Sequence, residues 1–102
     1  EDVHISKTLG ADCIEIHTGR LANLTKLKKN YFNELKRIKK CVILAGNLNL
    51  EVHVGHGLDY KTTKLLSHIK EIKEYNIGHF IIGESLFYGF KKVIKNFKSI
   101  LI

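Results

Sequence analysis

Short segments rich in β-branched residues alternate along the chain with longer segments of helical periodicity, and this alternation constrains the fold most strongly. The strand candidates are Cys13–Gly19 (CIEIHTG), Leu50–Val54 (LEVHV) and Glu74–Gly78 (EYNIG). Each connection is long enough for a right-handed crossover between parallel strands. Parallel sheets belong to doubly wound folds or to (β/α)8 barrels. We therefore expect an α/β fold with a parallel sheet whose strands are ordered as in the chain.

Apolar residues spaced by three or four positions predict the helices. One long helix is expected to run from Leu24 to Ala45. A second is expected to follow an N-terminal cap at Asp59. A short helix from about His79 and a long one from about Tyr88 complete the pattern.

The composition is that of one small domain and argues against two classes of partner. The net charge is +7, but the lysines interleave with apolar positions at helical spacing, as they do on solvated faces. Lysine outnumbers arginine 15 to 2, whereas arginine is favoured for phosphate and base recognition. No apolar run has the length of a membrane span. We therefore expect neither a nucleic-acid partner nor a membrane partner.

Cysteine usage and the first residue carry two further expectations. Cys13 and Cys41 do not have the spacing of a metal site, which favours a reduced, cytoplasmic protein. The chain begins at Glu1 and lacks methionine, so we expect it to be part of a longer protein.

Polar residues and glycines gather where the predicted strands end, at the edge that carries the site in parallel α/β folds. His56 lies between Gly55 and Gly57, and it is either a turn residue or a side chain presented to a ligand. Glu15 and His17 alternate with isoleucines and point to one side of the first strand. A carboxylate facing a barrel interior is costly unless it is paired or used, and both explanations remain open for Glu15.

The segment NIGH suggests phosphate binding. Gly78 ends the last predicted strand and His79 opens a helix, whose N-terminus presents free N–H groups and a partial positive charge. In (β/α)8 barrels a phosphate commonly lies at such an extra helix. The alternative is that Gly78 only makes a tight turn. Among the other histidines, His53 alternates with valines and is expected to face inward, whereas His4 and His68 are expected on the surface.

Three segments in the order GADCIEIHTG (10–19), VGHGLDY (54–60) and NIGHFIIG (76–83) resemble the C-terminal part of the pyridoxine 5′-phosphate synthase family. The likeness runs from about Ile5 to the end of the chain. It implies a partial (β/α)8 TIM barrel in which the three strands are the sixth to eighth. Residues 1–102 would then be the C-terminal portion of a single barrel domain whose N-terminal part is missing.

The resemblance also implies an activity and residue roles. The family comprises homo-octameric transferases of vitamin B6 biosynthesis that need no metal or organic cofactor. They condense 1-deoxy-D-xylulose 5-phosphate with 3-amino-2-oxopropyl phosphate to pyridoxine 5′-phosphate, phosphate and water. By position, His56 matches the proton donor and Glu15 the transition-state stabiliser. Gly57, Gly78 and His79 match contacts to the amino-ketone phosphate.

Some features depart from the family or lie outside it. His53 and Val54 stand where members commonly have Asn-Ala, and Glu84 stands where many have arginine. The catalytic bases of the family's N-terminal half have no counterpart here, so we expect the segment alone to be inactive, with unpaired sheet edges and an uncovered apolar sheet face. The alternatives are another phosphate-binding barrel enzyme, of the sugar-phosphate isomerase type, and a basic, non-enzymatic binding module.

Overall fold

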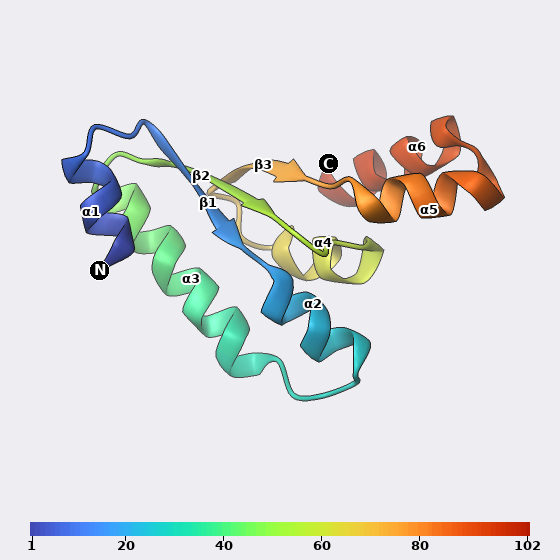
Figure 1. Ribbon diagram of the computed structural model, residues 1–102, viewed down its shortest axis with the longest axis horizontal. Coiled ribbons are helices and arrows are strands. Elements are labelled where there is room, and N and C mark those ends of the chain that lie inside the picture. Colours follow the sequence, from blue (N-terminus) through green and yellow to red (C-terminus); the bar gives the residue numbers. More distant parts are fainter.

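The computed structural model describes residues 1–102 as a three-stranded sheet with six helices (Figure 1). The elements in order are α1 (Asp2–Thr8), β1 (Cys13–His17), α2 (Gly19–Lys26), α3 (Phe32–Asn47), β2 (Glu51–Gly55), α4 (Tyr60–Leu66), β3 (Ile72–Asn76), α5 (His79–Tyr88) and α6 (Phe90–Leu101). The strands pair in parallel in the order β1-β2-β3. The predicted α/β class, the parallel pairing and the strand order are confirmed.

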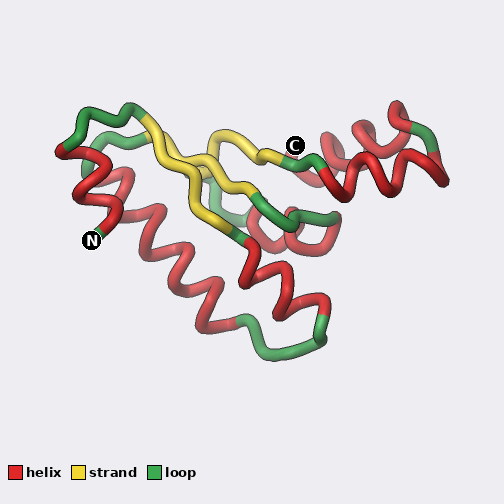
Figure 2. Tube along the Cα trace, viewed as in Figure 1, coloured by secondary structure: helices red, strands yellow, loops and turns green.

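One face of the sheet carries the hydrophobic core. Helices α2, α3 and α4 lie along this face in Figures 1 and 2, whereas α5 and α6 extend beyond the end of β3. Val52 and Val54 of β2 point into the core and are almost fully buried. They join buried residues of the helices, among them Leu21, Ile38, Val42 and Leu66. Burial of these side chains supplies the main driving force for the segment to fold.

The other face of the sheet is uncovered, and it is polar. Glu15, Glu74 and Asn76 are exposed on it, and His53 lies between them. The expectation of an uncovered apolar face is therefore wrong. In β1 and β2 the cause is the period-two alternation of the strand, which sends the β-branched residues to the helices and the charged residues to the other side. Strand β3 is irregular: its register with β2 shifts between Val52 and His53.

The predicted long helix from Leu24 to Ala45 is also wrong, because the structure divides it into α2 and α3. Lys28 adopts a left-handed conformation with φ 54° just after α2. The N–H groups of Lys28 and Lys29 donate to the carbonyls of Thr25 and Leu24, which closes the helix in a Schellman motif. The apolar spacing continues across this break, so periodicity alone did not show it.

The remaining boundaries agree with the sequence to within a few residues. Asp59 caps α4 as predicted, in a capping box in which its carboxylate accepts a hydrogen bond from the Thr62 N–H at 2.8 Å. Helix α5 begins at His79, as expected, and α6 begins at Phe90. Strand β3 covers Ile72–Asn76 rather than Glu74–Gly78, because the last residues of that prediction form the turn into α5.

Candidate functional site

Thr18 connects the loops that follow β1 and β2 by hydrogen bonds. Its side chain is fully buried, and its Oγ1 lies 2.8 Å from the Gly55 carbonyl oxygen and 2.9 Å from that of His56. The Thr18 N–H also donates to the Gly55 carbonyl, at 2.9 Å. Sequence reasoning missed Thr18, although its place between the strand end and Gly19 was a signal. The contacts fix the backbone that carries His56.

His56 is held in an unusual backbone conformation. Its φ is 88°, a region that residues with a side chain rarely occupy, and the following Gly57 has φ 71°. A side chain at Gly57 would bring its Cβ within 2.9 Å of the Ala22 Cβ, so α2 packs closely against this loop. Backbone strain of this kind persists only where the surroundings impose it, and it is common at functional sites. The exposed His56 ring is thus presented by a rigid turn.

The carboxylate of Glu15 lies over the end of β2. A Cβ added at Gly55 would lie 2.7 Å from Glu15 Oε1, so the missing side chain makes room for the carboxylate. Asn76 of β3 donates a hydrogen bond from Nδ2 to Glu15 Oε2 at 2.5 Å. The carboxylate is therefore paired, by a partner that sequence reasoning did not identify.

His53 lies on the uncovered face of the sheet, where it pairs in register with Glu15 of β1. Its Nε2 lies 2.8 Å from Glu51 Oε1, and its Nδ1 lies 3.7 Å from Glu74 Oε1. The hydrogen bond to Glu51 raises the pKa of His53. The negative charges of Glu74, Glu51 and Glu15 act in the same direction, and burial opposes them. His53, which stands where the family commonly has asparagine, thus has two carboxylate neighbours, Glu51 and Glu74, that stabilise its charged imidazole.

The second departure, Glu84, lies on α5 and forms no ion pair. Nothing in the structure explains it.

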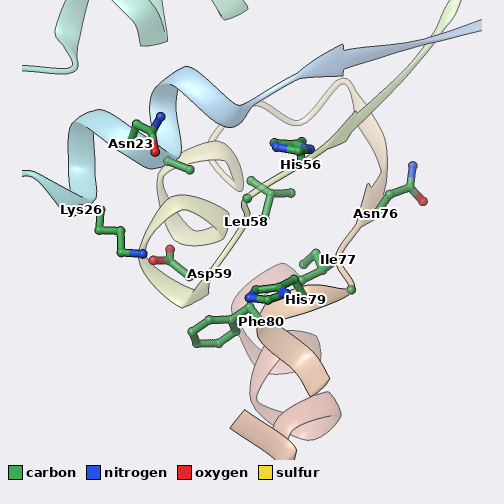
Figure 3. Close-up of a pocket in the computed structure, with 12 residues that line it drawn as sticks. Asn23, Lys26, His56, Leu58, Asp59, Asn76, Ile77, His79 and Phe80 are labelled. Carbon is green, nitrogen blue, oxygen red and sulfur yellow. The ribbon is translucent and has the colours of Figure 1, made fainter. Parts of the chain in front are cut away.

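A pocket of about 700 Å³ opens between α2, the loop after β2 and the start of α5 (Figure 3). His56, Gly57, Gly78 and His79 all line it. Glu15 does not, but Asn76 lines the pocket and donates to the Glu15 carboxylate. The structure therefore gathers four of the five predicted site residues around one cavity and links the fifth to it by a hydrogen bond.

The pocket is suited to an anion at one end. Gly78 is the N-cap of α5 and has no side chain, so the first N–H groups of the helix lie beside the cavity. A Cβ added at Gly78 would meet nothing within 4 Å, because the position opens on free space. Asn23 and Lys26 of α2 also line the pocket, and Figure 3 shows Lys26 directed toward Asp59. Sequence reasoning missed both residues of α2.

The structure shows neither a metal-binding cluster nor a membrane-spanning helix. No group of three or more histidine, cysteine, aspartate or glutamate side chains is arranged to hold a metal ion. None of the helices combines the length and the apolar character needed to cross a bilayer.

The fold and the pocket define a parallel α/β protein whose polar loops gather at the carboxyl edge of its sheet. The sequence profile described as "Pyridoxal phosphate biosynthesis protein PdxJ" matches residues 1–102. The chain belongs to the PdxJ family, which confirms the resemblance drawn from the three motifs.

Relatives support the same assignment. The chain is 60% identical over 100 residues to pyridoxine 5′-phosphate synthase of Pelagibacter ubique (strain HTCC1062), covering 98% of this chain and 42% of the relative. It is 44% identical over 102 residues to the synthase of Sulfurihydrogenibium sp. (strain YO3AOP1), covering 100% and 41%. It is 40% identical over 101 residues to pyridoxine 5′-phosphate synthase of Legionella pneumophila (strain Corby), covering 99% of this chain and 40% of the relative. The chain thus spans about two fifths of the length of these relatives.

Proposed function

We propose that residues 1–102 are the last three βα units of a (β/α)8 barrel, with β1, β2 and β3 as its sixth to eighth strands. The complete protein would be a pyridoxine 5′-phosphate synthase. It would condense 1-deoxy-D-xylulose 5-phosphate with 3-amino-2-oxopropyl phosphate to pyridoxine 5′-phosphate, phosphate and water. One observation carries the proposal: His56, Gly57, Gly78 and His79, from the loops after two strands, line a single pocket in a chain of the PdxJ family.

The proposed roles follow from where each group lies. The phosphate of the amino ketone binds at the N-terminus of α5, where Gly78 allows the anion to approach the backbone and His79 flanks it. Gly57 offers backbone contact to the same substrate. His56 donates a proton during the condensation, which proceeds through a Schiff base, loss of water and phosphate, and ring closure. Glu15 stabilises the cationic states that arise along this path.

The proposal extends to assembly and surroundings. Strands β1 and β3 each have an unpaired edge, and the polar face of the sheet has no cover, as expected where further strands close a barrel. The segment alone would therefore be inactive. We propose that the complete protein works as a homo-octamer in the cytoplasm on small phosphorylated substrates, without metal or organic cofactor. The two free cysteines agree with a reducing compartment.

The test is product analysis with the complete protein that contains this segment. Both substrates are supplied, and pyridoxine 5′-phosphate and inorganic phosphate are measured separately. We expect the two products in equal amounts. Isomerisation of a single sugar phosphate would instead indicate the other barrel enzyme. Nucleic-acid binding that weakens steeply with salt, without turnover, would indicate the basic binding module.

A further inference from the structure

The rings of His17 and His56 are stacked. Their centroids are 4.3 Å apart, and the ring planes differ by 25°. His17 is the last residue of β1, and His56 lies in the loop after β2, so the contact joins the ends of two neighbouring strands. The His56 imidazole has no hydrogen-bond partner within the chain, and the stack is therefore the contact that can set its ring plane.

Gly19 shows how closely the rings are surrounded. A Cβ at this position would lie 2.6 Å from Cε1 of His17 and 2.9 Å from Cδ2 of His56. The φ of Gly19 is not in the left-handed region, so its backbone would accept alanine. The absent side chain is required by the two rings and not by the backbone.

His17 is itself held by a contact within its own segment. Its Nδ1 accepts a hydrogen bond from the Gly19 N–H at 3.3 Å. This contact orients the ring that stacks on His56.

We propose that His17 is a positioning residue, which fixes the imidazole plane of His56 by ring stacking so that its proton points into the pocket. The proposal rests on the proposed function, since it takes His56 as the proton donor. Thr18 fixes the backbone of His56, and His17 fixes its ring. The segment His17-Thr18-Gly19 thus positions the side chain of His56 on the neighbouring loop.

The experiment uses the complete protein and distinguishes the effect of the stacked ring of His17 from the effect of its nitrogen atoms. His17→Ala removes the stack, and His17→Phe keeps a flat ring without hydrogen-bonding atoms. We expect His17→Ala to lower kcat about tenfold or more with little change in KM, because a misplaced catalytic group costs rate and not binding. His17→Phe should recover most of that loss.

Gly19→Ala tests the same idea without altering either histidine. Its Cβ displaces both rings, so kcat should fall as it does in His17→Ala. The matched control is Gly46→Ala, another helical glycine, at which a Cβ meets nothing within 4 Å. Gly46→Ala should leave kcat unchanged. Normal kcat in both His17→Ala and Gly19→Ala would overturn the proposal.

Two measurements distinguish this proposal from the proposed function. If His56→Asn turns over normally, His56 is not the proton donor, and the assignment of function to that residue fails. The position of the His56 ring is followed separately by the NMR shift of its Cε1–H, which a stacked ring displaces. This shift should change in His17→Ala and persist in His17→Phe. An unchanged shift in His17→Ala would refute the stacking role whatever the activity of His56.

Discussion

Gly55→Ala should displace the Glu15 carboxylate and lower turnover while leaving the free energy of unfolding nearly unchanged. Gly55 is the buried last residue of β2, and its φ is not in the left-handed region, so the strand backbone accepts alanine. The new Cβ would lie 2.7 Å from Glu15 Oε1 and 2.8 Å from Cδ. Ordinary van der Waals contact begins near 3.4 Å, so the carboxylate must move by about 0.7 Å. It is the end of a flexible side chain and can do so.

The expected change in stability is small because two effects oppose each other. Moving the carboxylate weakens the hydrogen bond from Asn76, which at an exposed site contributes about 1 kcal/mol. Replacing glycine by alanine restricts the unfolded chain and stabilises the fold by about 0.4–1 kcal/mol. The free energy of unfolding should therefore change by less than about 1 kcal/mol. The rate should change far more, since displacing a catalytic group by about 1 Å can lower turnover on the order of a hundredfold.

The assay compares kcat and urea unfolding for the complete protein and three variants. Gly55→Ala and Glu15→Gln should both lose turnover, and Gly46→Ala should behave like the unmodified protein. The reasoning is refuted if Gly55→Ala keeps kcat within about twofold while Glu15→Gln loses it, because a shift of this size should matter. A loss of stability above about 3 kcal/mol in Gly55→Ala would show instead that Gly55 is needed for packing.

Three further predictions concern neighbouring positions, all in the complete protein. Gly78→Val should leave folding intact but weaken binding of the amino-ketone phosphate by about 2 kcal/mol, roughly thirtyfold in Kd; unchanged affinity by calorimetry would reject the phosphate site. Thr18→Val keeps the shape but removes the hydroxyl from two carbonyls, and chemical denaturation should show a loss of about 1–2 kcal/mol. His53→Asn should reduce stability by up to about 1 kcal/mol below about pH 6.5. The folded-state pKa of His53 is raised, so its contribution is complete below the unfolded-state pKa and is lost as the pH rises through the folded-state value. Equal destabilisation by His53→Asn at acidic and alkaline pH, in urea titrations, would contradict the ion pairing with Glu51.

The strand pattern could be predicted because each strand is specified locally. Runs such as Leu50–Val54 combine β-branched residues with an adjacent glycine turn, and their long connections leave parallel pairing as the simple solution. The start of α5 at His79 followed from the glycine before it. The break between α2 and α3 could not be predicted, because Lys28 occupies the left-handed position that glycine or asparagine usually marks.

The sequence allowed us to predict where several candidate residues meet, but not the contacts that they make. Residues at the carboxyl ends of parallel strands meet at one edge, and this rule brought His56 and Gly78 to the same pocket. The hydrogen bond between Asn76 and Glu15 joins residues 61 positions apart on strands that are not neighbours. Such a contact depends on the register across the whole sheet, and no local pattern encodes it. The hydrogen bonds from Thr18 to the carbonyls of Gly55 and His56 depend on the same register.

The charge on the uncovered face of the sheet limits how the barrel can be completed. Glu15, Glu51 and Glu74 surround His53, which can neutralise at most one of the three carboxylates. In the proposed barrel this face is the interior, where an unpaired carboxylate is costly to bury. The strands that close the barrel must therefore bring cationic or hydrogen-bonding side chains, or admit water, opposite these glutamates. Under the proposed function, the same excess of negative charge would favour a substrate that becomes cationic next to Glu15, while the N-terminus of α5 would favour its phosphate at the rim. The apolar face of the sheet thus fixes the strands against the helices, and in the proposed barrel the polar face would set the charge of the interior.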